Sequence, residues 1–191
     1  MTDDGGVALV LVDVIKAFYD PRGAFYYPES REALRGTRRL LEAARAGGRV
    51  VVHARDVHRE GHPDFEERKL PRHCLAGGLD AEFVPGFEPG PQEVEIHKRR
   101  FSAFYATDLE LVLRERDARS VVVSGVKTNV CIRATAQDAF AAGFEPILVR
   151  GSVNSNRPHL HEASLEDVER YMGRVVGMEE GERILRDGTA R

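Results

Sequence analysis

Six short runs of apolar, largely β-branched residues recur along the chain and constrain its fold more than any other feature. They span Val7–Val14, Arg49–Ala54, Val94–His97, Ser120–Val126, Pro146–Arg150 and Arg174–Met178. Each run is shorter than a typical helix, and continuous apolar runs of this length are typical of strands that are buried on both faces. The sequence therefore predicts six buried strands.

Segments with helical periodicity separate most of these strands. Apolar residues three or four positions apart predict helices over Glu29–Ala46, Thr107–Glu115, Thr128–Ala142 and Leu160–Met172. Because strands and helices alternate, right-handed crossovers and a parallel sheet with helices on both faces are favoured. We therefore predict the α/β class, as a doubly wound three-layer sandwich around a six-stranded parallel sheet.

The length and composition suit one domain. A chain of 191 residues with 42% apolar and 31% charged residues can bury a full hydrophobic core. We expect a single domain over residues 1–191, in which residues 1–6 are flexible. Residues 56–91 are too long and too rich in Pro, Gly, His and charge for a simple crossover, so we predict an inserted metal-binding or substrate-binding loop there.

The charge pattern narrows the classes of partner. The net charge is −3 with acids and bases interspersed, which argues against nucleic acid and favours a small molecule. The acidic start Met1–Gly6 is unlike a signal peptide, and no apolar run is long enough to span a membrane. We expect a cytoplasmic protein with no membrane partner, in which Cys74 and Cys131 are reduced thiols.

Reactive side chains follow four of the predicted strands. Asp13 closes the first strand, and Lys98 follows the third. Asp56 and His58 follow the second, and Cys131 lies one turn into the helix after the fourth. Since ligands of open parallel sheets bind beyond the carboxyl ends of the strands, we expect these residues at one crevice.

Cys131 is a candidate nucleophile. Thr128 or Asn129 can cap the helix that follows the fourth strand, and the exposed N–H groups of a helix start favour a thiolate and can hold an oxyanion. Asp13 can serve as the base and Lys98 as the cation of an activated nucleophile. The alternatives are a small buried Cys131, a capping role for Asp13 and a solvated Lys98.

Asp56, His58, His62 and His73 form a second candidate site. Carboxylate and imidazole ligands suit zinc, iron and manganese alike, so we predict a divalent metal ion. The surrounding charged residues are equally typical of an exposed polar loop.

Three motifs together resemble one family, the isochorismatase-like cysteine hydrolases, from Val7 to about Met178. The motifs are Asp13 with Phe18, then Lys98–Phe104 with Thr107–Leu109, then Gly125–Ala139. The resemblance implies the six-stranded parallel fold and a catalytic triad of Asp13, Lys98 and Cys131. It also implies a cis peptide at Val126–Lys127, and the oxyanion is expected at the N–H groups of Lys127 and Cys131.

Within this family, Arg55–His58, Leu70–Cys74 and Gly77–Phe83 look like the nicotinamidase and pyrazinamidase branch. The likeness implies a homo-oligomeric amidase that hydrolyses nicotinamide to nicotinate and ammonia through a thioester. It also implies a metal ion on Asp56, His58 and His73, with His62 as a further ligand.

The sequence departs from this branch around the substrate. The chain has no tryptophan, and Leu70 stands where the branch usually carries one. Ile15 and Lys127 replace a common glutamine and a common small residue. We expect the pocket to include Leu70 and aromatic residues drawn from Phe18, Phe101, Phe104 and Tyr105.

Three alternatives therefore stay open. The triad could act on another small amide or carbamoyl compound, the metal could generate hydroxide beside a structural Cys131, or the fold could serve a non-catalytic binding protein.

Overall fold

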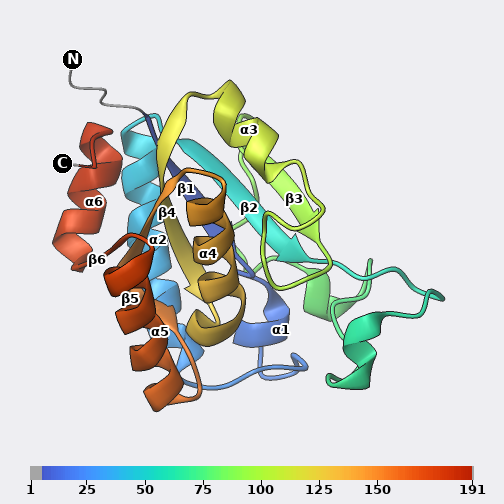
Figure 1. Cartoon of the computed structure of the whole chain (residues 1–191). Coiled ribbons are helices and arrows are strands. Elements are labelled where there is room, and N and C mark those ends of the chain that lie inside the picture. Colours follow the sequence, from blue (N-terminus) through green and yellow to red (C-terminus); the bar gives the residue numbers. More distant parts are fainter. Residues whose placement is uncertain (1–5, 191) are drawn as a thin grey trace.

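The computed structural model describes residues 6–190, and its six strands form one parallel sheet in the order β3-β2-β1-β4-β5-β6 (Figure 1). The strands are β1 (Gly6–Val12), β2 (Val50–Asp56), β3 (Val94–Lys98), β4 (Ala118–Val126), β5 (Glu145–Asn154) and β6 (Arg174–Val176). The predicted six-stranded parallel sheet is confirmed. The strand order reverses between β1 and β4, which places the ligand-binding crevice of an α/β sheet at their carboxyl ends.

Helices cover both faces of the sheet (Figure 1). One layer contains α1 (Lys16–Tyr19), α2 (Ser30–Ala46) and α6 (Met178–Asp187). The other contains α3 (Leu109–Glu115), α4 (Arg133–Ala141) and α5 (Pro158–Tyr171). The arrangement is the predicted three-layer sandwich.

The central strand β1 shows why these residues form a buried strand. Its side chains alternate between two cores: Leu9 and Leu11 pack against the α2 and α6 layer, whereas Val10 and Val12 pack toward α3, α4 and α5. All four side chains are almost fully buried. Each contributes about 1.5–3 kcal/mol by leaving water, so the apolar run itself stabilises the three-layer arrangement.

Several boundaries differ from the predicted ones. β5 continues through Asn154, beyond the predicted end at Arg150, because the chain bends at Gly151, whose φ is +85°, and then pairs again with β4. β6 stops at Val176, and the strongly amphipathic α6, which the sequence analysis did not predict, begins at Met178. Of the segment 1–6 predicted to be flexible, residues 1–5 lie outside the described residues, and Gly6 begins β1.

The segment between β2 and β3, residues 57–93, folds beside the carboxyl ends of the strands (the green part of Figure 1). It contains two 3-10 turns, η1 (Phe65–Arg68) and η2 (Leu79–Ala81). Isolated bridges pair His58 with Leu75, and Phe83 with Ile15. Among the described residues, no helix is long and apolar enough to cross a membrane.

Gly125 allows β1 and β4 to approach closely next to the crevice. Its φ is +122°, and a Cβ atom at this position would lie 2.0 Å from the carbonyl oxygen of Val12. Any larger residue would separate the two strands, so glycine here keeps the strand ends that carry Asp13 and Lys127 together.

Candidate active site

Asp13, Lys98 and Cys131 meet in one buried cluster at the carboxyl edge of the sheet. The Lys98 Nζ lies 2.9 Å from Asp13 Oδ2 and 3.7 Å from Cys131 Sγ. The three residues are 0%, 1% and 6% exposed. The cation therefore contacts both the carboxylate and the thiol, and the three residues lie together as the strand-end argument predicted.

The backbone turns at Asp13 to bring its carboxylate inward. Asp13 has a φ of +56°, a left-handed conformation that costs a residue other than glycine about 1–2 kcal/mol. Its N–H donates to the Ala54 carbonyl at 2.9 Å, and its Oδ1 accepts the N–H of Asp56 at 2.9 Å. These bonds to β2 hold the strained turn in place.

Burial and charge set the protonation state of the cluster. Burial raises the pKa of the Asp13 carboxyl above its usual value, although the Lys98 charge acts against this rise. Burial alone would lower the pKa of Lys98. The Asp13 charge and the acidic groups of Cys131 and Asp56 around it raise that pKa instead, so Lys98 stays an ammonium. Burial also raises the pKa of the Cys131 thiol well above its usual value.

Burial therefore favours a neutral thiol at Cys131, which hydrogen-bonds Asp13. It acts against the thiolate that the start of the helix was expected to favour. The cluster is electrically balanced when Asp13 and Lys98 are ionised and the thiol is not.

The turn before Cys131 carries the cis peptide that the family resemblance implied, between Val126 and Lys127. The following turn, η3 (Thr128–Ile132), is π-helical, a form that is rare and frequent at functional sites. The predicted side-chain cap is wrong, because Lys127 is the N-cap and no side chain caps the turn. The Thr128 hydroxyl instead hydrogen-bonds the ring of His161 at 2.8 Å, and the side-chain oxygen of Asn129 accepts a hydrogen bond from the loop that follows β5.

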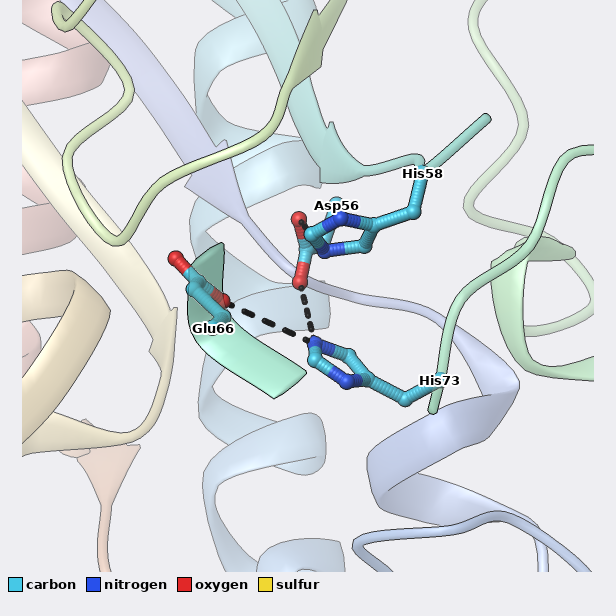
Figure 2. A group of neighbouring side chains, drawn as sticks. All are labelled: Asp56, His58, Glu66 and His73. Atoms are coloured by element: carbon cyan, nitrogen blue, oxygen red, sulfur yellow. Dashed lines mark hydrogen bonds and ion pairs between the residues drawn. The ribbon is translucent and has the colours of Figure 1, made fainter. Parts of the chain in front are cut away.

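A second cluster beside the first consists of Asp56, His58, Glu66 and His73 (Figure 2). One ligand atom from each lies within 4.8 Å of the others, and all four residues are buried. His62, predicted as a further ligand, is exposed and outside this group, and Glu66 from η1 takes its place. The sequence offered no signal for Glu66, because several acids surround it and only the η1 turn directs it inward.

The donor set fits a divalent cation. Asp56 Oδ1 and His58 Nε2 are buried without a hydrogen-bond partner, 3.1 Å apart. Nδ1 of His73 donates to the Pro71 carbonyl at 2.7 Å, which leaves its Nε2 facing the cluster. The Asp56 carboxylate raises the pKa of His58 to about 9. Burial would lower the pKa of His73, but the same carboxylate raises it. A bound cation would displace these protons, and two carboxylates with two neutral imidazoles would then carry a charge of about −2, which suits zinc, iron or manganese.

Asp64 orients His58 from behind. Its Oδ2 lies 2.9 Å from Nδ1 of His58, and it also pairs with Arg99 and Arg100, at 3.0 Å each. A carboxylate on the far nitrogen of a ligand histidine sets the ring's orientation and increases its basicity.

Replacing Asp64 with asparagine is therefore expected to weaken divalent-metal affinity by about 10- to 100-fold. Competition with a chromophoric chelator measures the affinity. Arg99→Gln is the matched control, because it removes an ion pair of Asp64 but keeps the His58 contact. Equal affinities for Asp64→Asn and wild type would contradict this role.

Together, Asp56, His58, Glu66 and His73 form what we call the metal-type cluster. A cavity of about 450 Å³ opens beside Cys131 and this cluster. Of the residues predicted for the pocket, Phe18, Leu70 and Phe101 line it. Phe104 and Tyr105 are absent from its lining, so their predicted contact with the substrate is not supported.

The reason lies in their packing. Phe104 lies 5.9 Å from Phe144, ring to ring, in the core beneath α3 and α4. Tyr105 is 61% exposed and lines a neighbouring hollow together with Leu70 and Phe101. Phe25, which sequence reasoning missed, completes the aromatic wall instead: it stacks on Phe18 at 5.5 Å and meets the His73 ring edge-on at 4.7 Å. Nothing in the sequence distinguishes it from the adjacent tyrosines.

Comparisons with known proteins agree with this geometry. The isochorismatase domain model matches residues 7–180. Maleamate amidohydrolase from Pseudomonas putida is 33% identical over 94% of this chain and 86% of its own length. The nicotinamidase/pyrazinamidase structure from Bacillus subtilis has a TM-score of 0.83, 31% identity, and covers 90% of this chain and 99% of its own. The pyrazinamidase of Pyrococcus horikoshii in complex with zinc has a TM-score of 0.82, 33% identity and the same coverage.

Proposed function

Because the chain belongs to the isochorismatase family, we propose that Asp13, Lys98 and Cys131 are the catalytic triad of an amidohydrolase that acts through a thioester. The observation that carries the proposal is the buried Lys98 ammonium, which contacts both the Cys131 thiol and the buried Asp13 carboxylate at the wall of a cavity. This is the arrangement of an activated nucleophile with its base.

In the first half of the reaction, Asp13 accepts the proton of Cys131 as the sulfur attacks the amide carbonyl carbon. The Lys98 ammonium, 3.7 Å from the sulfur, stabilises the developing negative charge. We assign the N–H groups of Lys127 and Cys131, in the turn after β4, to the oxyanion. Asp13 then returns the proton to the amide nitrogen, the C–N bond breaks, and ammonia leaves.

In the second half, water replaces ammonia. Asp13 accepts a proton from the water, whose oxygen attacks the thioester carbonyl carbon. The C–S bond breaks, Asp13 returns the proton to the sulfur, and the carboxylic acid is released. Asp13 thus serves each half-reaction once as base and once as acid.

A metal ion held by Asp56, His58, Glu66 and His73 would act as a Lewis acid that orients a donor atom of the substrate. Two of these residues, Asp56 and His73, line the same cavity as Cys131.

Two substrate classes are compatible with this site. The metal-type cluster and the nicotinamidase-like structural relatives favour nicotinamide, with nicotinate and ammonia as products. The maleamate-hydrolysing relative and a cationic side chain in the cavity favour an amide that carries a carboxylate. Homo-oligomeric assembly and a cytoplasmic location remain predictions.

Ammonia release from nicotinamide, pyrazinamide and maleamate, with metal content measured on the same sample, tests the proposed function. We expect at least one amide to be hydrolysed, and iodoacetamide to abolish the activity by alkylating Cys131; Cys74 is fully buried away from the cavity. Activity that survives alkylation but is lost with a chelator would instead indicate metal-hydroxide chemistry. A protein inactive on every amide would indicate a binding role.

A further inference from the structure

Lys127 places an ammonium group in the cavity that contains Cys131. It directly follows β4, and its Nζ lies 5.9, 5.7 and 5.3 Å from the ring centroids of Phe18, Phe25 and Tyr27. A cation within about 6 Å of an aromatic ring centroid is attracted to the ring face. The rings therefore attract the Lys127 ammonium but carry no net charge to neutralise it.

Three of the other charged groups of the cavity wall are already engaged: Asp56 and His73 belong to the metal-type cluster, and Arg133 pairs with Asp167 at 3.0 Å. Within residues 6–190, by contrast, no carboxylate lies within ion-pairing distance of Lys127, which is half-buried. Asp138 is a further carboxylate of the wall, and it likewise forms no ion pair with Lys127.

Burial and a neighbouring positive charge further destabilise the Lys127 ammonium. Burial lowers the pKa of Lys127, and the nearby Arg157 charge lowers it further, although Cys131 acts in the opposite direction. An ammonium that is partly desolvated and has no counter-charge is unfavourable, and an incoming anion removes that cost.

We propose that Lys127 binds a carboxylate at the non-reacting end of the substrate, and that the protein therefore acts on small amides that carry a negative charge. The inference rests on the proposed amidohydrolase function and names its substrate class. A cavity of about 450 Å³ has room for a short monoamide of a dicarboxylic acid, with the amide at Cys131 and the carboxylate at Lys127.

A different role for Lys127 would be to stabilise charge on the sulfur or the oxyanion. The two roles differ in one measurable respect. A catalytic charge accelerates every amide, whereas a substrate-binding charge favours only those amides that carry an anion.

Succinamate and 4-methylpentanamide separate these roles, because they have the same shape and differ only in a carboxylate replaced by an isopropyl group. We expect wild type to prefer succinamate in kcat/KM, and Lys127→Met to lower the ratio of succinamate to 4-methylpentanamide by about 30-fold or more. Lys127→Arg should keep most of the ratio. Arg133→Gln, which removes a cavity cation that is already paired, should leave the ratio near its wild-type value.

The outcomes distinguish this inference from the proposed function. Equal losses on both amides, or a wild type that hydrolyses 4-methylpentanamide as well as succinamate, would overturn the inference and leave the amidohydrolase standing. If wild type hydrolyses neither amide, calorimetric binding of succinate to Cys131→Ala decides: binding that Lys127→Met weakens supports charge recognition, and binding that it leaves unchanged overturns it.

Discussion

Replacing Cys131 with alanine is expected to lower kcat on any amide substrate by a factor on the order of 10⁴ to 10⁶, because no thioester can form. The fold should persist, since the substitution removes one sulfur atom from a cavity wall and leaves the Asp13–Lys98 ion pair at 2.9 Å intact. Ammonia release measures the activity, and thermal unfolding measures the fold.

Cys74→Ala is the matched control. Cys74 is the other cysteine of the chain and is fully buried in the α2 and α6 core, away from the cavity. Its variant should retain most of the activity. A Cys131→Ala protein with more than about a hundredth of wild-type kcat would remove Cys131 from the mechanism.

Replacing Lys98 with methionine is expected to abolish activity and also to lower the free energy of unfolding by about 3–5 kcal/mol. The lysine is the ammonium partner of Asp13 at 2.9 Å, and both side chains are inaccessible to water. Without it, a carboxylate remains buried with no counter-charge at that distance. Urea unfolding measures the effect, in the presence of a chelator so that metal binding does not contribute.

The double variant Asp13→Asn/Lys98→Met tests the cause. It removes both charges, and an asparagine carbonyl can still accept the N–H of Asp56 that Asp13 Oδ1 accepts at 2.9 Å. We therefore expect the double variant to be more stable than Lys98→Met alone, although equally inactive. A double variant as unstable as the single one would mean that the loss of Lys98 packing, and not an unpaired charge, destabilises the protein.

The position of the triad followed from the sequence because it depends on local pattern. Continuous apolar runs identify parallel buried strands, and every such strand directs its carboxyl end to the same edge of the sheet. Asp13 and Lys98 lie at two of those ends, and Cys131 follows a third in the next turn. Register then completes the arrangement, since Asp56 of β2 pairs with Lys98 of β3.

The fourth member of the metal-type cluster and the aromatic wall depended on tertiary structure. Residues 57–93 have no helical or strand periodicity, so spacing cannot indicate which of their acids or histidines face inward. His62 and Glu66 are equally suitable as ligands in the sequence, and the η1 turn turns only Glu66 toward Asp56. The sequence analysis likewise predicted Phe104 in the cavity wall, where Phe25 lies instead. Phe104 packs against Phe144 in the core.

The charge balance of the cavity is a further property that only the folded chain has. The sequence contains 28 lysines and arginines, of which Lys127 is one, and 31 aspartates and glutamates. Nothing in it indicates that the Lys127 ammonium has no carboxylate partner. Folding surrounds it with the rings of Phe18, Phe25 and Tyr27, from α1 and the loop after it. Strand patterns thus determined the fold and the edge of the sheet at which Asp13, Lys98 and Cys131 meet, because hydrophobic burial acts through local periodicity. Packing of aperiodic loops decided which acids, histidines and rings face the metal-type cluster and the cavity, because those contacts join residues far apart in the chain.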